Sequence, residues 1–197
     1  MKSVKKLISF IGIFSLVFVI LACGNKKSSE QKVQKQSNKS KVEQAQTESA
    51  AAPGEMGGKA PNFQLNNLQE KQVELKDFKG EVVLLNFWGI WCPPCKKEIP
   101  ELIEIQKENK AKEFSIVSIA LPRGPVSGIK DFVQKNNINY PVLVGQGKAL
   151  KSIMEKYGGI RGVPTTFLID NKGVIQHKWV GPRSKEQFMQ EINKLIK

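Results

Sequence analysis

Two cysteines, Cys92 and Cys95, are separated by two prolines, and this spacing suits two kinds of chemistry. A Cys-x-x-Cys pair can open and close a small disulfide ring, or it can supply half of a tetrahedral zinc site. A zinc site needs about four ligands, and the rest of the sequence offers only Cys23 and His177. An inert structural disulfide is also disfavoured, because so short a ring constrains the unfolded chain little. The pair therefore predicts a redox-active disulfide that needs neither a metal nor a cofactor.

The residues on either side of the pair predict a strand followed by a helix. The run 82–88 is almost continuously apolar, which is typical of a strand buried on both faces of a sheet. Pro93 and Pro94 suit a first helical turn, where a missing N–H costs nothing. Cys92 is then expected at the helix N-terminus, where free N–H groups and the helix dipole stabilise a thiolate. We therefore expect a reactive cysteine at this position.

The amino terminus predicts export and attachment to a membrane. Residues 1–6 contain three lysines, residues 7–21 are apolar apart from two serines and one glycine, and Ala22 precedes Cys23. This pattern is typical of an export signal, and it is short for a membrane-spanning helix of ~20 residues, although an uncleaved anchor is the alternative. The stretch 20–23 also resembles a bacterial lipobox. That resemblance implies a signal peptide over residues 1–22 and a lipid on Cys23.

Residues 23–59 predict a flexible tether between the lipid and the folded part. This segment has no aromatic residue and few large hydrophobic ones, so it cannot bury enough apolar surface to fold. A flexible chain of this length would hold the domain ~30–36 Å from the membrane. The expected protein is exported and anchored by lipid to the bacterial cell membrane, with its domain on the extracytoplasmic side.

The formal net charge is +13, with no block of basic residues interleaved with aromatic ones. An exported protein rarely meets nucleic acid, so this charge favours a soluble surface that faces an anionic membrane or cell wall. We expect no nucleic-acid partner and a monomer.

Residues 60–197 predict one α/β domain. The apolar periodicity predicts, in order, a hairpin over 63–75, a strand over 82–88, a helix after Cys95, a strand over 114–121, a helix over 127–135, a strand over 141–144, a helix over 150–157, a hairpin over 165–180 and a last helix from Ser184. This order indicates a mixed central sheet flanked by helices, with an N-terminal β-hairpin and an inserted strand and helix.

The pattern resembles the thioredoxin fold, and specifically the extracytoplasmic thiol–disulfide oxidoreductases of the TlpA/ResA type, over residues 60–196. The resemblance rests on the hairpin before the buried strand, on Asn86-Phe87-Trp88, on Trp91-Cys92-Pro93-Pro94-Cys95, on Pro100 and on Gly162-Val163-Pro164-Thr165-Thr166-Phe167. It implies a thioredoxin-like enzyme with a redox-active disulfide between the two cysteines.

The resemblance also implies a role for each matching residue. Cys92 would be the exposed nucleophile that attacks a substrate disulfide, and Cys95 would resolve the mixed disulfide. The Val163–Pro164 bond would be cis and would leave the Val163 backbone free to pair with an extended substrate. Trp91, Pro93 and Pro94 would complete the substrate-binding surface beside Cys92.

Proton transfer is where this sequence departs from cytosolic thioredoxins, which have a buried aspartate where this chain has Asn86. Asparagine cannot accept a proton, so proton transfer to Cys95 must use water or another acid. Glu98 matches an acidic position in the ResA-like branch and follows Cys95 by three residues, which brings the two near each other on a helix. The alternative is a solvated glutamate among its charged neighbours.

These observations predict a reductase. Electrons would pass from a membrane thiol carrier through Cys92 and Cys95 to a disulfide of an exported protein, with apocytochrome c and extracellular methionine sulfoxide reductases as the recipients that the resemblance implies. The same residues could instead form disulfides, since direction depends on which redox state is stabilised. Two further alternatives are a thiol peroxidase and a tethered binding module without catalysis. The Pro-x-x-x-Thr/Ser-x-x-Cys pattern of such peroxidases is absent around both Cys92 and Cys95.

Overall fold

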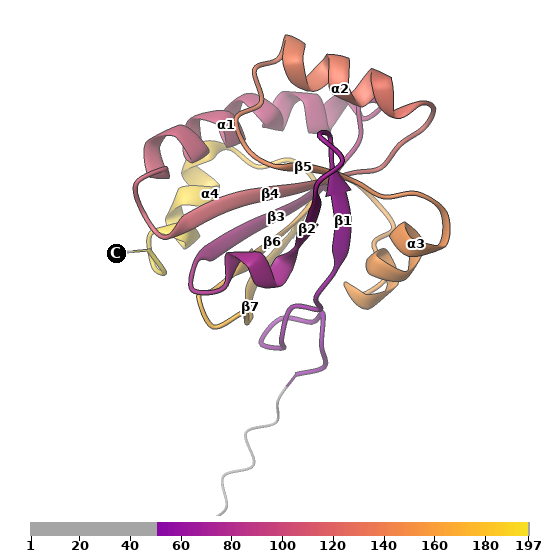
Figure 1. Cartoon of the computed structure of the whole chain (residues 1–197). Coiled ribbons are helices and arrows are strands. Elements are labelled where there is room, and N and C mark those ends of the chain that lie inside the picture. The colour runs from indigo at the N-terminus through magenta and orange to yellow at the C-terminus, as the bar shows by residue number, and fades with distance from the viewer. Residues whose placement is uncertain (1–50, 197) are drawn as a thin grey trace, which may run out of the picture. The chain divides into compact units, whose positions relative to one another are not determined.

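The computed structural model describes residues 51–196, so the predicted signal peptide, Cys23 and the tether up to residue 50 lie outside the described residues. The elements in chain order (Figure 1) are β1 (Gln64–Asn67), β2 (Gln72–Glu74), a 3-10 turn η1 (Leu75–Phe78), β3 (Val82–Trp88), α1 (Pro93–Asn109), β4 (Phe114–Ala120), α2 (Val126–Lys135), β5 (Val142–Val144), α3 (Gly147–Lys156), β6 (Thr165–Ile169), β7 (Ile175–Val180) and α4 (Lys185–Ile192). Each predicted helix and strand is confirmed, with ends that differ by a few residues.

The strands form one seven-stranded sheet in the order β2-β1-β5-β4-β3-β6-β7. The central strand β3 runs parallel to β4 and antiparallel to β6, and the hairpins β1–β2 and β6–β7 close the two edges. All seven residues of β3 are buried, as the continuous apolar run predicts for a strand covered on both faces. The predicted thioredoxin-type α/β fold, with a mixed sheet between helices, is confirmed.

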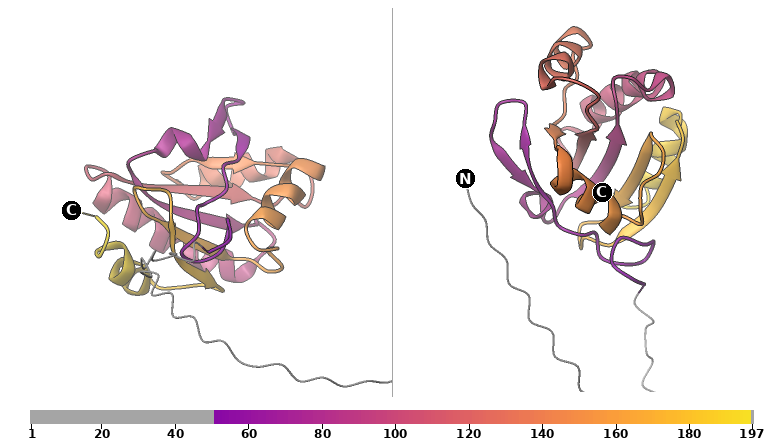
Figure 2. Two further views of the ribbon diagram at one scale, coloured as in Figure 1. Left: turned by 90° about the horizontal axis from the view of Figure 1, so that it is seen from below. Right: turned by 90° about the vertical axis from the view of Figure 1, so that its right-hand side faces the viewer.

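Alternate residues of β3 enter two separate hydrophobic cores, because successive side chains of a strand point to opposite faces. Val82, Leu84 and Trp88 pack on the face that α1, α2 and α4 cover. Val83, Leu85 and Phe87 pack on the other face, beneath α3 and η1. Figure 2 shows the sheet lying between these helical layers.

The folded part begins before residue 60, where the sequence places the end of the tether. The N–H of Gly57 donates to the carbonyl of Ile175, and the N–H of Ile175 donates to the carbonyl of Gly58. Lys59 then forms an antiparallel bridge with Val174. These backbone hydrogen bonds attach residues 57–59 to the start of β7, so this part of the predicted tether belongs to the domain. Composition could not reveal it, since backbone pairing places little demand on side-chain type.

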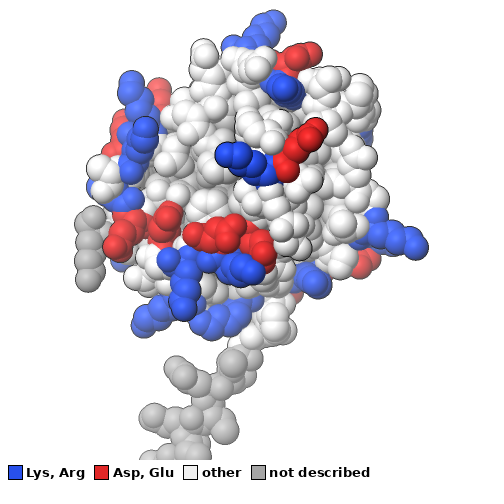
Figure 3. Space-filling model, viewed as in Figure 1, with Lys and Arg blue, Asp and Glu red and all other residues white. Residues whose placement is uncertain are grey.

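Charged groups on the domain are mixed in sign. On the face in Figure 3, lysines and arginines lie close to acidic side chains near the lower edge, and much of the remaining surface is uncharged. Within residues 51–196, none of the helices has the length and apolar character that crossing a membrane requires.

Candidate active site

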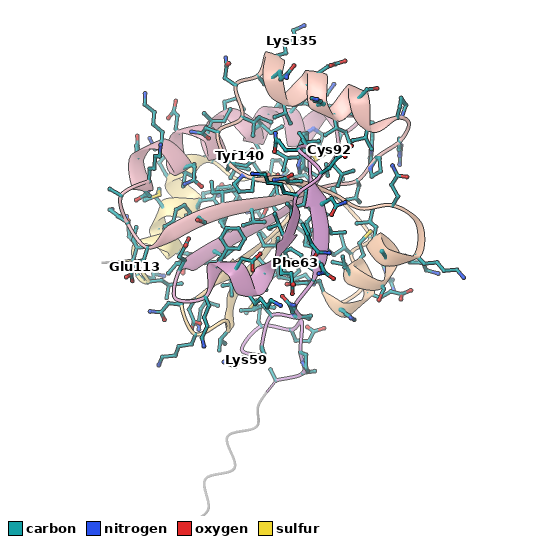
Figure 4. All side chains as sticks on the ribbon, viewed as in Figure 1. Lys59, Phe63, Cys92, Glu113, Lys135 and Tyr140 are labelled. Carbon is teal, nitrogen blue, oxygen red and sulfur yellow. A yellow bond between two sulfur atoms is a disulfide. The ribbon has the colours of Figure 1, made fainter. Side chains whose placement is uncertain are left out.

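Cys92 and Cys95 form a disulfide at the N-terminus of α1. The chain leaves β3 through a turn in which the N–H of Cys92 donates to the carbonyl of Gly89, 3.1 Å away. Cys92 is the N-cap of α1, and Pro93 and Pro94 occupy the first helical positions. The prediction for this stretch is confirmed, because two prolines in a first turn remove only N–H groups that have no helical partner. Figure 4 shows Cys92 at the end of the sheet away from Lys59.

The geometry around Cys92 favours a thiolate there. The backbone N–H of Cys95 donates to the Cys92 sulfur at 3.2 Å. When the disulfide is reduced, the same N–H and the positive end of the helix dipole stabilise negative charge on that sulfur. The helix N-terminus therefore selects Cys92, and not Cys95, as the more acidic thiol of the pair.

In the disulfide state Cys92 is less exposed than the resemblance implies. Its side chain is only 3% accessible and that of Cys95 is 1% accessible. The cause is the loop before β6, because the Val163 carbonyl oxygen lies 3.5 Å from the Cys92 sulfur. The Val163 backbone therefore borders Cys92, which is consistent with the substrate pairing expected there.

The Val163–Pro164 peptide bond is cis, as the family resemblance predicts. Two hydrogen bonds hold the loop that contains it. The Thr165 hydroxyl donates to the Gly162 carbonyl at 2.7 Å, and the Gly181 N–H donates to the Pro164 carbonyl at 2.8 Å. The backbone of Val163 is thus fixed against the disulfide before any substrate binds.

Glu98 lies one turn after Cys95 on α1 and is only 2% accessible. One carboxylate oxygen accepts from the side-chain amide of Asn86 at 3.2 Å, and the other accepts from the backbone N–H of Arg183 at 3.0 Å. Burial raises the pKa of Glu98 from its ordinary 4.5 to about 7, and the two hydrogen bonds oppose that rise only in part. The solvated alternative is therefore wrong, and a carboxyl group with this pKa can gain or lose a proton near neutral pH.

Three contributors to this environment were missed in the sequence. Thr166 accepts the second hydrogen bond of the Asn86 amide, at 2.9 Å. Arg183 contributes its backbone N–H, and Tyr140 lies close enough for the Glu98 charge to add to burial in raising the pKa of its hydroxyl. A polar residue within the apolar run 165–169 could have signalled Thr166. Nothing local signals the other two, because they approach from distant parts of the chain.

Trp91 is held beside the disulfide by contacts on both sides of its ring. Its indole N–H donates to the Leu121 carbonyl at 2.9 Å. The Arg123 guanidinium lies 3.5 Å from the centre of the ring, and on another side a Cβ at Gly89 would lie 2.6 Å from the indole nitrogen. Glycine at that position therefore leaves the space that the indole occupies. Trp91 and Val163 both line a groove of about 330 Å³.

Within residues 51–196, no group of three or more His, Cys, Asp or Glu side chains is arranged to hold a metal ion. Of the predicted site residues in this range, the structure gathers Trp91, Cys92, Cys95, Val163 and Pro164 around one disulfide. Glu98 lies in the buried layer behind them. Pro93 is exposed and Pro94 half-buried at the start of α1. This fold and this site define a thioredoxin-fold enzyme that works by dithiol–disulfide exchange.

Known proteins place the chain within a family. A family model described as AhpC/TSA family matches residues 56–178, and the chain belongs to that family. The thiol-disulfide oxidoreductase ResA of Bacillus thuringiensis subsp. konkukian is 38% identical over 141 residues, which are 72% of this chain and 79% of that protein. ResA of Bacillus subtilis is 33% identical, over 72% of this chain and 75% of its own length. A putative thiol:disulfide interchange protein DsbE from Chlorobium tepidum has a TM-score of 0.64 and 33% identity, over 72% of this chain and 97% of that one. The protein is accordingly a thiol–disulfide oxidoreductase of the ResA/DsbE type.

Proposed function

We propose that the protein is a lipid-anchored reductase that works outside the cytoplasmic membrane on disulfides of exported proteins. Candidate substrates are the haem-site cysteines of apocytochrome c and extracellular methionine sulfoxide reductases. The observation that carries the catalytic part is the Cys92–Cys95 disulfide at a helix N-terminus, with the buried Glu98 one turn behind it. The N-terminal pattern of lysines, apolar run and Ala22-Cys23 supports the anchor and the location.

The first step uses the reduced protein. The Cys92 thiolate attacks one sulfur of a substrate disulfide, so a protein–substrate S–S bond forms while the substrate S–S bond breaks. The leaving sulfur departs as a thiolate and takes a proton from solvent. The Cys95 N–H promotes this step because it stabilises negative charge on the Cys92 sulfur.

The second step releases the substrate. Glu98, with a pKa of about 7, accepts the proton of the Cys95 thiol. The Cys95 thiolate then attacks the Cys92 sulfur, which restores the protein disulfide and frees the second substrate sulfur as a thiol. The substrate gains two electrons from the protein and two protons, one from solvent in the first step and one that Glu98 took from Cys95. A membrane dithiol carrier returns them in the reverse exchange, because no other cysteine pair is present in the sequence.

The direction of electron flow is tested by the reduction potential of the Cys92–Cys95 pair, measured by equilibrating the protein with a glutathione redox buffer. A value near that of thioredoxin, ~−270 mV or lower, supports a reductase. A value near ~−120 mV refutes it and makes the protein a donor of disulfides to exported proteins.

The catalytic roles are tested by trapping. Full-length protein with Cys95→Ser should accumulate a mixed disulfide with its substrate, because Cys92 attacks and nothing resolves the product. The matched variant Cys92→Ser should trap nothing. Equal trapping by both variants would contradict the assigned roles, and mass spectrometry of the trapped species identifies the substrate.

The anchor has its own test. Cells given a labelled fatty acid should incorporate the label into the wild-type protein. The variant Cys23→Ala should remain unlabelled. Label that persists in the Cys23→Ala variant, or a wild-type protein without label, rules out the lipid at Cys23.

A further inference from the structure

The groove beside the disulfide has an unusual combination of an apolar floor and a charged rim. Its floor is built from Leu121, Leu150, Met154 and Ile160, and its end nearest the disulfide is formed by Trp91 and Val163. The charged residues that line it are Arg123 and Arg161, and no acidic residue is among its lining residues. The groove therefore presents two positive charges to whatever occupies it.

A second depression adjoins the groove along α3 and adds no net charge to it. This depression has a volume of about 350 Å³ and shares Leu150, Met154, Ile160 and Arg161 with the groove, so the two are neighbours. The other charged residues that line it are Lys151 and Glu155, which pair at 3.8 Å and offset each other. Arg161 thus stands where the two depressions meet, and its charge has no acidic neighbour in the groove itself.

Each arginine is close, in sequence or in space, to a residue beside Cys92. Arg161 precedes Val163 by two residues, and the Val163 carbonyl lies 3.5 Å from the Cys92 sulfur. Arg123 is stacked on the ring of Trp91, the residue next to Cys92. Stacking orders a guanidinium while leaving its N–H edge free to bind a carboxylate.

We infer that this groove selects disulfide-containing segments with an acidic side chain close to the attacked cysteine, together with an apolar side chain for the floor. An extended chain advances about 3.3 Å per residue, so a carboxylate one to three residues from that cysteine reaches the arginines while its neighbour enters the groove. Arg123 and Arg161 are specificity residues in this inference, which rests on the proposed reductase function. The exchange is unchanged: the protein dithiol becomes a disulfide as the segment's disulfide becomes two thiols.

The inference is tested with the full-length reduced protein and three disulfide peptides. They differ only at the residue two positions from the cysteine, which is Asp, Asn or Lys, and each carries a neighbouring leucine. A nearby charge alters the intrinsic reactivity of a disulfide. Each kcat/KM is therefore divided by the rate constant for reduction of the same peptide by a small neutral dithiol. The corrected value should be roughly three- to tenfold higher for the Asp peptide than for the Asn peptide at low salt, lowest for the Lys peptide, and the difference should shrink in high salt.

Two variants and a control assign the effect to the groove. Arg161→Gln should reduce the ratio of Asp to Asn peptide, and Arg161→Glu, which leaves the groove without net charge because Arg123 remains, should abolish the preference. Lys135→Gln removes the same charge at the far end of α2 and should retain the wild-type order (Figure 4).

The possible outcomes separate the inference from the function beneath it. Rapid reduction of all three peptides at equal corrected rates overturns the inference and leaves the reductase standing. A wild-type preference that persists unchanged in Arg161→Glu also overturns it. Failure to reduce any peptide, while the pair itself is fully reduced at the start, refutes the proposed function and the inference with it.

Discussion

The buried carboxyl of Glu98 should make the protein less stable as the pH rises. The perturbation is the replacement Glu98→Gln, which removes the titrating group while retaining its size. The expected signature is a pH-dependent gap between wild type and variant, because a native pKa above the unfolded one means that the native state binds the proton more tightly.

The magnitude follows from the two pKa values. The pKa of Glu98 rises from 4.5 to about 7 on folding, chiefly because burial disfavours the charged form. Each pH unit between these values is worth about 1.4 kcal/mol, so ionising Glu98 in the native state removes about 3 kcal/mol of stability. This stabilisation is fully present below about pH 4.5, declines as the pH rises toward 7 and is lost above it.

Urea unfolding of the oxidised protein from about pH 4 to about pH 9 measures the effect. The disulfide must stay intact, because free thiols would add their own titration. The free energy of unfolding of wild type, minus that of Glu98→Gln, should fall by about 3 kcal/mol across this range. The glutamine also leaves one donor facing either Asn86 or Arg183 without an acceptor, but that cost is constant with pH and does not alter the fall.

The control is Glu104→Gln on the exposed side of the same helix, where Glu104 pairs with Lys185 at the surface. This variant should retain the wild-type dependence on pH, since Glu98 is still present. Parallel curves for wild type and Glu98→Gln would refute the reasoning, because they would mean that the carboxyl group titrates alike in the folded and unfolded chain.

Three further perturbations have simple readouts. The rate at which Cys95 resolves a mixed disulfide, measured by stopped flow, should rise as the pH passes about 7. In Glu98→Gln this rise should move toward the ordinary cysteine pKa of about 8.5. An unchanged pH profile in the variant excludes Glu98 as the base. Ser184→Ala should cost about 1 kcal/mol in urea unfolding, because Ser184 caps α4 in a capping box, and a neutral result would mean that the cap is dispensable. Tyr157→Phe should cost about 1 kcal/mol, because the hydroxyl donates to the Pro61 carbonyl at 2.7 Å, and an unchanged melting temperature would show that water replaces that bond.

The sequence predicts the elements well where one local signal is decisive. The run 82–88 can only be a strand covered on both faces, and β3 is that strand. The sequence predicts that the last helix starts at Ser184, and Ser184 is the N-cap of α4. α3 begins at Gly147, before the predicted stripe at Leu150, because a helix starts where its backbone turns and not at its first buried side chain.

The site is harder to predict, because its chemistry depends on contacts between distant segments. The charged neighbours of Glu98 in sequence suggest a solvated residue, yet its partners are Asn86 on β3 and the N–H of Arg183 before α4. The arginines of the groove are likewise separate in sequence, and only the fold brings Arg123 and Arg161 to one depression. Local pattern identifies the reacting sulfurs, and tertiary structure decides what surrounds them.

The two sulfurs of the disulfide meet two different environments, and this separates two functions of the site. Cys92 faces Val163, which also lines the groove that we infer to bind substrate side chains. Cys95 shares its buried side of α1 with Glu98, where a proton is held. Substitutions at Arg161 should therefore change which disulfides are reduced without moving the pH profile of resolution. Substitutions at Glu98 should move that profile without changing the order of preference among peptides, and a double variant should show both effects independently.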